Sequence, residues 1–204
     1  MISRILVASS LVAAAALGLA LAPSQQEGDK PAEAPNGRYE IDPVHSIAMF
    51  KISHMNVGRS YGRFNKMSGK VLIDAEQPEE SLITLAIDVN SVDTNAAARD
   101  THLKGPDFFN AAEHPKITFE SEKVKVKDAT HFDVTGKLSL HGVEKEITVP
   151  VERTGFGSFP AAFGGTRVGY ETKFTIKRTD YKMDYRTDVV GDEVEILISI
   201  EATR

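Results

Sequence analysis

The stretch FDVTGKLSLHGVEKEITVPV, residues 132–151, alternates apolar and polar side chains on both sides of a short turn. Small or apolar residues occupy every second position from Phe132 to Leu140, and they resume at Ile147 after a turn that we expect at residues 142–145. Alternation with a period of two is what a strand with one buried face requires, because successive side chains leave opposite faces of the sheet. The stretch therefore predicts a β-hairpin.

The same alternation recurs along the chain, in about eight segments between Ser46 and Ala202. Besides the hairpin, the regular segments are residues 83–89, 168–176 and 194–202. No helical pattern is long enough to cover a sheet, so these strands must bury their apolar faces against one another. The pattern predicts an all-β fold of antiparallel strands, closed as a barrel or packed as a sandwich.

Three further segments are less regular, and their irregularities predict bends or bulges. Residues 46–55 carry apolar side chains on both parities, and residues 64–73 are interrupted at residues 68–69. Between Phe119 and Val124 the apolar parity changes, which indicates a change of register. Bends of this kind are what a small barrel needs in order to close.

One connection breaks the run of strands. Residues 95–103 predict a short helix with Thr94 as its N-cap, and Pro106 marks a second helix start. The adjacent Phe108 and Phe109 either rim one end of the barrel or anchor their loop to the core. We therefore expect a short helical crossover segment in an otherwise all-β barrel.

The N-terminal residues are typical of a targeting segment. Arg4 followed by the apolar residues 5–22 predicts a signal peptide over residues 1–22, although the run is also long enough for an uncleaved membrane anchor. Residues 23–37 are polar and predict a flexible leader, and residues 38–204 predict one domain. We therefore expect a periplasmic or secreted protein.

Composition narrows the classes of function. The chain of 204 residues has no cysteine, which excludes disulfides, thiolate metal sites and cysteine nucleophiles. Its formal net charge of −5 argues against a nucleic-acid partner. The sequence shows no nucleophile elbow, phosphate loop or dinucleotide fingerprint, so we expect neither catalysis nor a cofactor.

The shared parity of the apolar residues predicts what lines the interior. An eight-stranded barrel is either packed solid or has room for one small ligand. The candidate ligand contacts on this inner face are Phe50, Ile52, His54, Phe64, Ile87, Phe119, Leu138, Leu140, Phe174, Ile176, Arg178, Ile196 and Ile198. His54 and Arg178 lie at strand ends, where polar groups suit a ligand with a hydrocarbon body and a polar head.

Structural roles for these two polar residues are the first alternative. His54 would then form a hydrogen bond within the fold, and Arg178 would pair with a carboxylate such as that of Asp100 or Asp180.

A second alternative is an exported redox or stress-response accessory protein, or a metal-dependent enzyme, that uses His54, His45 and His102. No two histidines have the short paired spacing of a zinc site, so we expect no metal.

Several short motifs also occur in a characteristic order. They are Tyr39, Glu40, Ile41 and Asp42; His45 and Ser46; Phe50, Ile52 and His54; Gly62 and Phe64; Ser91, Val92, Asp93 and Thr94; Arg99, Asp100, His102 and Leu103; Asp107, Phe108 and Phe109; Pro115, Ile117, Thr118, Phe119 and Ser121; Gly136, Leu138, Leu140, Gly142 and Val143; Arg178; Gly191, Asp192 and Val194. Together they resemble the YceI family of exported lipid-binding proteins and span nearly the whole chain after the leader.

The resemblance implies an extended, lipocalin-like barrel of eight antiparallel strands around an elongated apolar cavity. The ligand would be a polyisoprenoid, an isoprenoid quinone or another long-chain amphiphile such as a fatty acid, bound without catalysis. Whether the protein contacts a membrane transiently, and whether it forms a homodimer, are questions that the sequence leaves open. Two features depart from the family pattern: Lys182 follows Tyr181 where a glycine is common, and no tryptophan occurs near Phe163 and Gly164.

Overall fold

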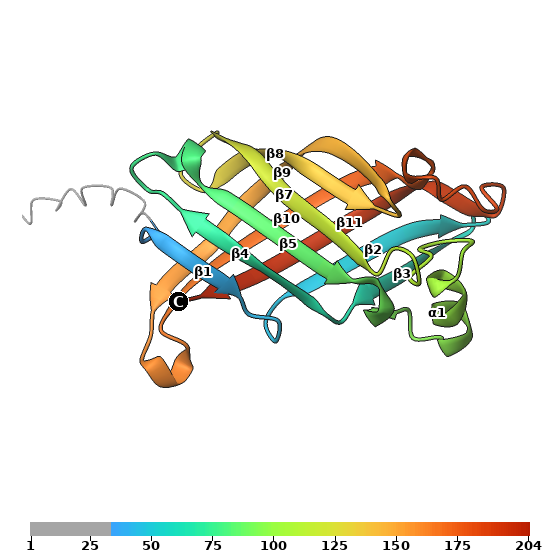
Figure 1. Ribbon diagram of the computed structural model, residues 1–204, viewed down its shortest axis with the longest axis horizontal. Coiled ribbons are helices and arrows are strands. Elements are labelled where there is room, and N and C mark those ends of the chain that lie inside the picture. The colour runs from blue at the N-terminus through green and yellow to red at the C-terminus, as the bar shows by residue number, and fades with distance from the viewer. Residues whose placement is uncertain (1–33) are drawn as a thin grey trace, which may run out of the picture. The chain divides into compact units, whose positions relative to one another are not determined.

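Residues 34–204 are described by the computed structural model, and they form a closed antiparallel β-barrel (Figure 1). The strands are β1 (Gly37–Ile41), β2 (Ile47–His54), β3 (Gly58–Phe64), β4 (Met67–Ile73), β5 (Leu82–Asp88), β6 (Val92–Asp93), β7 (Lys116–Val126), β8 (His131–Leu140), β9 (Val143–Ser158), β10 (Thr166–Lys177) and β11 (Val190–Thr203). The helical elements are α1 (Ala97–Lys104) and the short 3-10 turns η1 (Pro78–Glu80), η2 (Val89–Ser91), η3 (Ala161–Phe163) and η4 (Arg178–Tyr181). The expected all-β barrel with one short helix is confirmed.

The 11 strands combine into the 8 long strands of the barrel wall. β1 and β2 follow each other along the same edge of β11, β4 continues β3, and β6 continues β5. Each long strand pairs with its neighbours in sequence, and the pairing of β1 and β2 with β11 closes the sheet. The topology is therefore an up-and-down barrel.

The interruptions of these long strands lie side by side. The N–H of Asn65 donates to the carbonyl of Ser91, and the N–H of Asp88 donates to the carbonyl of Lys66. The prediction of a bend at residues 68–69 is therefore wrong, since these residues stay paired with β5. The strand is interrupted a few positions earlier, at Asn65 and Lys66.

The hairpin of residues 132–151 is tighter than expected. Its turn is the pair His141 and Gly142, whose φ angles are 53° and 72°, and the predicted turn at residues 142–145 is wrong. Two-residue turns with positive φ match the twist of the flanking strands, which lets both strands pair up to the turn. The register shift between β7 and β8 confirms the expected change of parity.

The crossover helix begins later than expected. α1 starts after Ala96, and Thr94 is not its N-cap, because the Thr94 N–H and hydroxyl both donate to the Asp100 carboxylate at 2.9 and 2.5 Å. No second helix starts at Pro106; turns cross residues 105–113 instead. The Asp100 carboxylate thus ties α1 back to the end of β6.

The two ends of the barrel differ. At the closed end, the Tyr39 side chain is fully buried and lies near buried Ala34. The Tyr39 hydroxyl donates to the carbonyl of Pro35, and the Arg204 guanidinium lies over the Tyr39 ring at 5.2 Å. The opposite end, which we call the loop end, carries α1 and the connection of residues 178–189 (Figure 1).

Residues 34–37 pack at the closed end, so the folded unit begins before Arg38, where we expected the domain to start. The expected signal peptide and most of the expected leader lie outside the described residues. Within residues 34–204, no helix is both long and apolar enough to cross a membrane.

The φ angle of Lys182 explains why a glycine would suit its position. Lys182 ends η4 in the left-handed conformation, with φ 61° and ψ 21°, which is unfavourable for a residue with a Cβ atom. We expect Lys182→Gly to raise the free energy of unfolding by about 1 kcal/mol, measured by urea denaturation. Lys182→Ala removes the same side chain and keeps the strain, so it should show no gain; equal stability of the two variants would contradict this account.

Candidate functional site

An apolar cavity of about 180 Å³ lies inside the barrel. Strands from around the wall contribute side chains to it, and Leu103, Phe108, Phe109 and Met183 reach it from the connections at the loop end. At the closed end the buried core around Tyr39 fills the barrel. The interior is therefore neither packed solid nor open throughout.

The predicted ligand contacts, apart from His54, all line this cavity. They are Phe50, Ile52, Phe64, Ile87, Phe119, Leu138, Leu140, Phe174, Ile176, Arg178, Ile196 and Ile198. Parity placed them correctly because the ladder keeps a period of two along each strand, so one face stays inside.

His54 does not line the cavity; its side chain is exposed at the end of β2. Its strand neighbours are Gly58 on β3 and Val190 on β11. Val190 itself lines the cavity, and residues directly opposite each other share a face of the sheet, so His54 keeps the inward parity. His54 is exposed because it is the last residue of β2 and lies past the end of the cavity, whose extent parity alone could not reveal.

Other lining residues were missed for two different reasons. Ile83, Leu85, Ile117 and Tyr170 share the parity of predicted neighbours, so the signal for them was present in the sequence. Met183 reaches the cavity from an irregular connection, where no periodicity marks the inward side. Phe108 and Phe109, expected to rim or anchor one end, line the cavity at the loop end.

Aromatic rings shape the cavity wall near β2 and β3. The rings of Phe50 and Phe64 lie 5.7 Å apart, and that of Phe109 lies 5.5 Å from Phe64 and 6.5 Å from Phe50. A Cβ atom at Gly62 would come within 2.2 Å of the Phe50 ring. Glycine at this position therefore lets the Phe50 ring lie close against β3; with a larger residue the ring would have to move.

Arg178 is the buried charge of the cavity, with 2% of its surface exposed. Its Nε, Nη1 and Nη2 donate to the carbonyls of Gly191, Met183 and Val190 at 2.8, 2.5 and 2.7 Å. Burial lowers the pKa of Arg178, and nearby Asp192 opposes that shift. Arginine nevertheless stays protonated. The guanidinium thus holds the connection after β10 against the start of β11.

The expected carboxylate partner of Arg178 is wrong. Asp100 accepts the hydrogen bonds of Thr94, and Asp180 pairs with Lys145 at 3.4 Å. Backbone carbonyls replace a carboxylate because the connection of residues 182–190 folds back over the guanidinium, which no sequence pattern indicates.

Tyr170 is another polar residue in the lining, which also includes Thr118, Thr172 and the exposed Glu171. Burial raises its pKa to about 12, against the opposing influence of Arg153. The phenol therefore stays protonated at physiological pH.

Two connections meet over the cavity at the loop end. The rings of His102 and Phe108 lie 5.1 Å apart, and each lies 5.5 Å from the ring of Tyr185 in an edge-to-face arrangement. His102 Nε2 donates a hydrogen bond to the Asp107 carboxylate at 2.8 Å. We call His102, Phe108 and Tyr185 the ring cluster; it joins α1 and its following turns to the connection after η4.

The three histidines of the metal or redox alternative have separate surroundings. His102 belongs to the ring cluster, His54 is exposed at the end of β2, and His45 bonds to Asp42 at 2.8 Å. Within residues 34–204, one set of candidate metal ligands lies close together: Asp42, His45 and Glu201. That set contains one of the three histidines, so the described residues do not form the constellation of that alternative.

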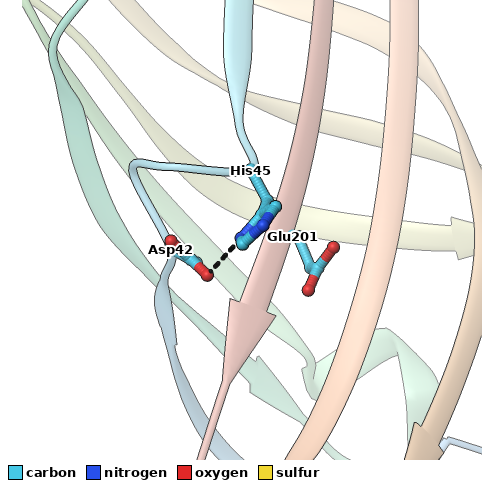
Figure 2. Close-up of side chains that lie close together, drawn as sticks. All are labelled: Asp42, His45 and Glu201. Carbon is cyan, nitrogen blue, oxygen red and sulfur yellow. Dashed lines mark hydrogen bonds and ion pairs between the residues drawn. The ribbon is translucent and has the colours of Figure 1, made fainter. Parts of the chain in front are cut away.

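The Asp42, His45 and Glu201 side chains lie near one another beside β11 (Figure 2). Arg167 Nη1 contacts both carboxylates, at 3.1 Å from Asp42 and in a close contact with Glu201. The Arg167 guanidinium therefore neutralises the carboxylates of Asp42 and Glu201, whose negative charge a bound metal ion would need. We call Asp42, His45, Arg167 and Glu201 the clasp, because it joins the end of β1 to β10 and β11.

The clasp lowers the pKa of Asp42 to about 2. The hydrogen bond with His45 is the main cause, and bonds from the Val44 N–H and from Arg167 add to it. The charged form of Asp42 is therefore favoured in the folded protein.

Replacing Arg178 should destabilise the protein strongly. Arg178→Met removes the donor from one buried and two partly buried carbonyls, so we expect a loss of about 2–4 kcal/mol in the free energy of unfolding, measured by urea denaturation. Lys177→Met changes the exposed neighbour and should cost little. Equal stability of the two variants would show that the guanidinium bonds are not needed.

Asp42 should make stability depend on acid pH. Because its pKa is lowered on folding, its contribution is complete above the ordinary value of 3.8 and is lost as pH falls through about 2. We expect Asp42→Asn to cost about 1 kcal/mol at neutral pH and to flatten the fall in stability between about pH 4 and pH 2. Glu40→Gln, in an exposed pair with Lys70, is the control. An unchanged acid profile for Asp42→Asn would contradict the clasp.

Comparison with known proteins agrees with this architecture. The YceI-like domain family matches residues 39–202. A UPF0312 protein of Pseudomonas aeruginosa is 37% identical over 193 residues, which are 95% of this chain and 97% of the relative. A UPF0312 protein of Yersinia pestis is 38% identical over 168 residues, which are 81% of this chain and 86% of the relative.

Solved structures show the same likeness. BcnA of Burkholderia cenocepacia has a TM-score of 0.72 at 28% identity and covers 80% of this chain and 99% of its own. A Campylobacter jejuni YceI protein has a TM-score of 0.66 at 29% identity, with 76% and 90% covered. A polyisoprenoid-binding domain of Saccharophagus degradans shares the fold, with a TM-score of 0.63, 21% identity, and 81% and 97% covered. The chain belongs to the YceI-like domain family.

Proposed function

We propose that this protein binds and carries or stores a long-chain isoprenoid lipid, such as a polyisoprenoid or an isoprenoid quinone, or a fatty-acid-type amphiphile, without catalysing a reaction. One observation carries the proposal: the cavity is lined almost wholly by apolar side chains, and its buried charge, Arg178, belongs to the connection at the loop end. An amphiphile fits this arrangement with its tail inside and its polar head toward the loop end.

Removal of hydrocarbon from water supplies the driving force. It is worth about 25 cal/mol for each Å² of apolar surface, so a buried chain of several isoprene units needs no charged contact to bind. The cavity of about 180 Å³ is smaller than the roughly 300–1,000 Å³ of pockets that enclose drug-sized ligands. A long tail must therefore push lining side chains apart or extend past the ring cluster.

Two ionisable residues of the lining, Tyr170 and Arg178, favour binding over catalysis. Tyr170 holds its proton up to a pKa of about 12, and the guanidinium of Arg178 is engaged by three backbone carbonyls. A general acid or base must exchange its proton near the working pH, which neither group does.

The family and the N-terminal sequence add support of different kinds. The Saccharophagus degradans domain is a polyisoprenoid-binding domain, and its likeness to this chain concerns the fold. The apolar run that follows Arg4 supports export, and we propose a periplasmic or secreted location.

A charge inside the cavity should abolish ligand retention. Ile198 on β11 lines the cavity, whereas the adjacent Leu197 does not, so Ile198→Glu and Leu197→Glu form a matched pair. We extract each purified protein with organic solvent, identify lipids by mass spectrometry, and then measure uptake of an added isoprenoid quinone. Wild type and Leu197→Glu should hold and take up lipid, and Ile198→Glu should lose uptake at least about a hundredfold, because burying a charge costs several kcal/mol.

Ile198→Phe keeps the site apolar while reducing its volume, so it serves where Ile198→Glu fails to fold. It should shift binding toward shorter tails. Two results would reject the proposal: wild-type protein that neither contains nor takes up lipid, or folded Ile198→Glu protein that retains lipid as well as wild type does.

A further inference from the structure

The turn between β2 and β3 is an exposed apolar tip at the loop end. Met55 is 59% exposed and Val57 is 91% exposed. Figure 1 shows the β2–β3 hairpin reaching the same end of the barrel as α1. The N–H of Met55 donates to the carbonyl of Val189 at 2.7 Å. The tip therefore lies directly beside the connection that supplies Met183 to the cavity.

The backbone conformation of the turn is unfavourable for Met55, so folding alone does not explain a methionine there. Met55 and Asn56 both have φ angles of 53°, in the left-handed region that favours asparagine or glycine. Met55 occupies such a position while its side chain remains largely in water. An unfavourable backbone together with an exposed apolar side chain points to a role outside the fold.

The β2–β3 hairpin that carries the tip has only basic charges, whereas the adjacent connection carries Asp184 and the ion pair of Arg186 with Asp188. Residues 43–73 contain no Asp or Glu, although the whole chain has a net charge of −5. Lys51, Arg63 and Lys70 form ion pairs with acids on neighbouring strands. Among residues 34–204, Arg59 has no ion-pair partner, and its guanidinium donates to the carbonyl of Gly58. An exposed cation thus stands two positions after Val57.

A second exposed apolar segment lies at the other end of the barrel. Phe163, 67% exposed, belongs to the connection between β9 and β10, and residues 155–165 contain no charged side chain. The nearby Arg167 is engaged by the clasp. This segment lacks both the free cation and the neighbouring cavity, so it provides a control for the tip.

We propose that Met55, Val57 and Arg59 form a membrane-docking tip that places the loop end of the barrel against a bilayer containing anionic phospholipid. The two apolar side chains enter the head-group region, where burial of apolar surface stabilises them. Arg59 pairs with lipid phosphate. The inference goes beyond the proposed ligand: it assigns the face through which a lipid passes between membrane and cavity.

Vesicle binding tests the tip directly. Full-length protein is mixed with vesicles of phosphatidylcholine and phosphatidylglycerol in equal parts, or of phosphatidylcholine alone, and bound protein is measured by flotation. Val57→Asp should weaken binding to the mixed vesicles about tenfold or more, since it replaces an inserted apolar group by a charge. Arg59→Ala should weaken binding to the mixed vesicles and reduce its dependence on salt. Phe163→Asp should bind as wild type does.

The absence of cysteine allows a second measurement with single labels. A polarity-sensitive fluorophore on Val57→Cys should shift to the blue when vesicles are added, and the same label on Phe163→Cys should not. The proposal is overturned by a wild-type protein that does not float with mixed vesicles, by a shift at position 163 instead of 57, or by self-association that Val57→Asp abolishes without vesicles. Vesicle binding needs no cavity ligand, so its failure would leave the lipid-binding proposal standing.

Discussion

Closure of the sheet, where β1 and β2 pair with β11, is the constraint on which the rest of the molecule depends. β1 pairs with β11 through Glu40 with Thr203 and Ile41 with Ala202, and β2 extends the same seam from the pair Ile47 and Ser199 to the pair His54 and Val190. The clasp bridges the break between β1 and β2, because Arg167 on β10 contacts Asp42 just after β1 and Glu201 on β11. The Ser46 hydroxyl also accepts from the Glu201 N–H. Without closure, the apolar inner face of every strand would meet water.

Closure also explains where the polar groups of the interior lie. A group buried inside the barrel must find its partners there, since water is excluded. Arg178 satisfies this requirement with backbone carbonyls at the loop end, and the middle of the cavity is left to side chains such as Phe119 and Ile198. The resulting interior is apolar along most of its length, with the Arg178 charge near the loop end and the uncharged Tyr170 phenol toward the closed-end core. A charge at one end of an otherwise apolar cavity is what suits an amphiphilic ligand.

The inner face was readable from the sequence because it follows a local rule. Phe50, Leu138 and Ile198 were placed correctly by parity, which each strand keeps for itself. His54 lies opposite Val190 on the inward parity but past the end of the cavity, so its side chain is exposed. Where the cavity ends depends on neighbouring strands and connections, and alternation within one strand does not contain that information.

Features that join distant segments could not be predicted. Asp42 and Arg167 meet across a sequence separation of 125 residues, and the carbonyl partners of Arg178 belong to Met183 in an irregular connection and to Val190 and Gly191 at the start of β11. Met183 reaches the cavity from the same connection. The volume of the interior was equally hidden, because it depends on how side chains from all strands pack together. Family resemblance suggested a cavity, and the structure supplied its extent.

The central claim is that a lipid tail occupies the interior of the barrel, and methyl NMR tests it most directly. Protein with labelled Ile and Leu methyl groups is mixed with a long-chain isoprenoid quinone, and nuclear Overhauser effects between protein and tail are recorded. The account predicts contacts from the tail to the cavity methyl groups of Ile87, Leu138 and Ile198, and none to Leu72 or Leu82, which are exposed on the outer face. Contacts confined to outer-face methyl groups, with the cavity methyl signals unchanged, would contradict it.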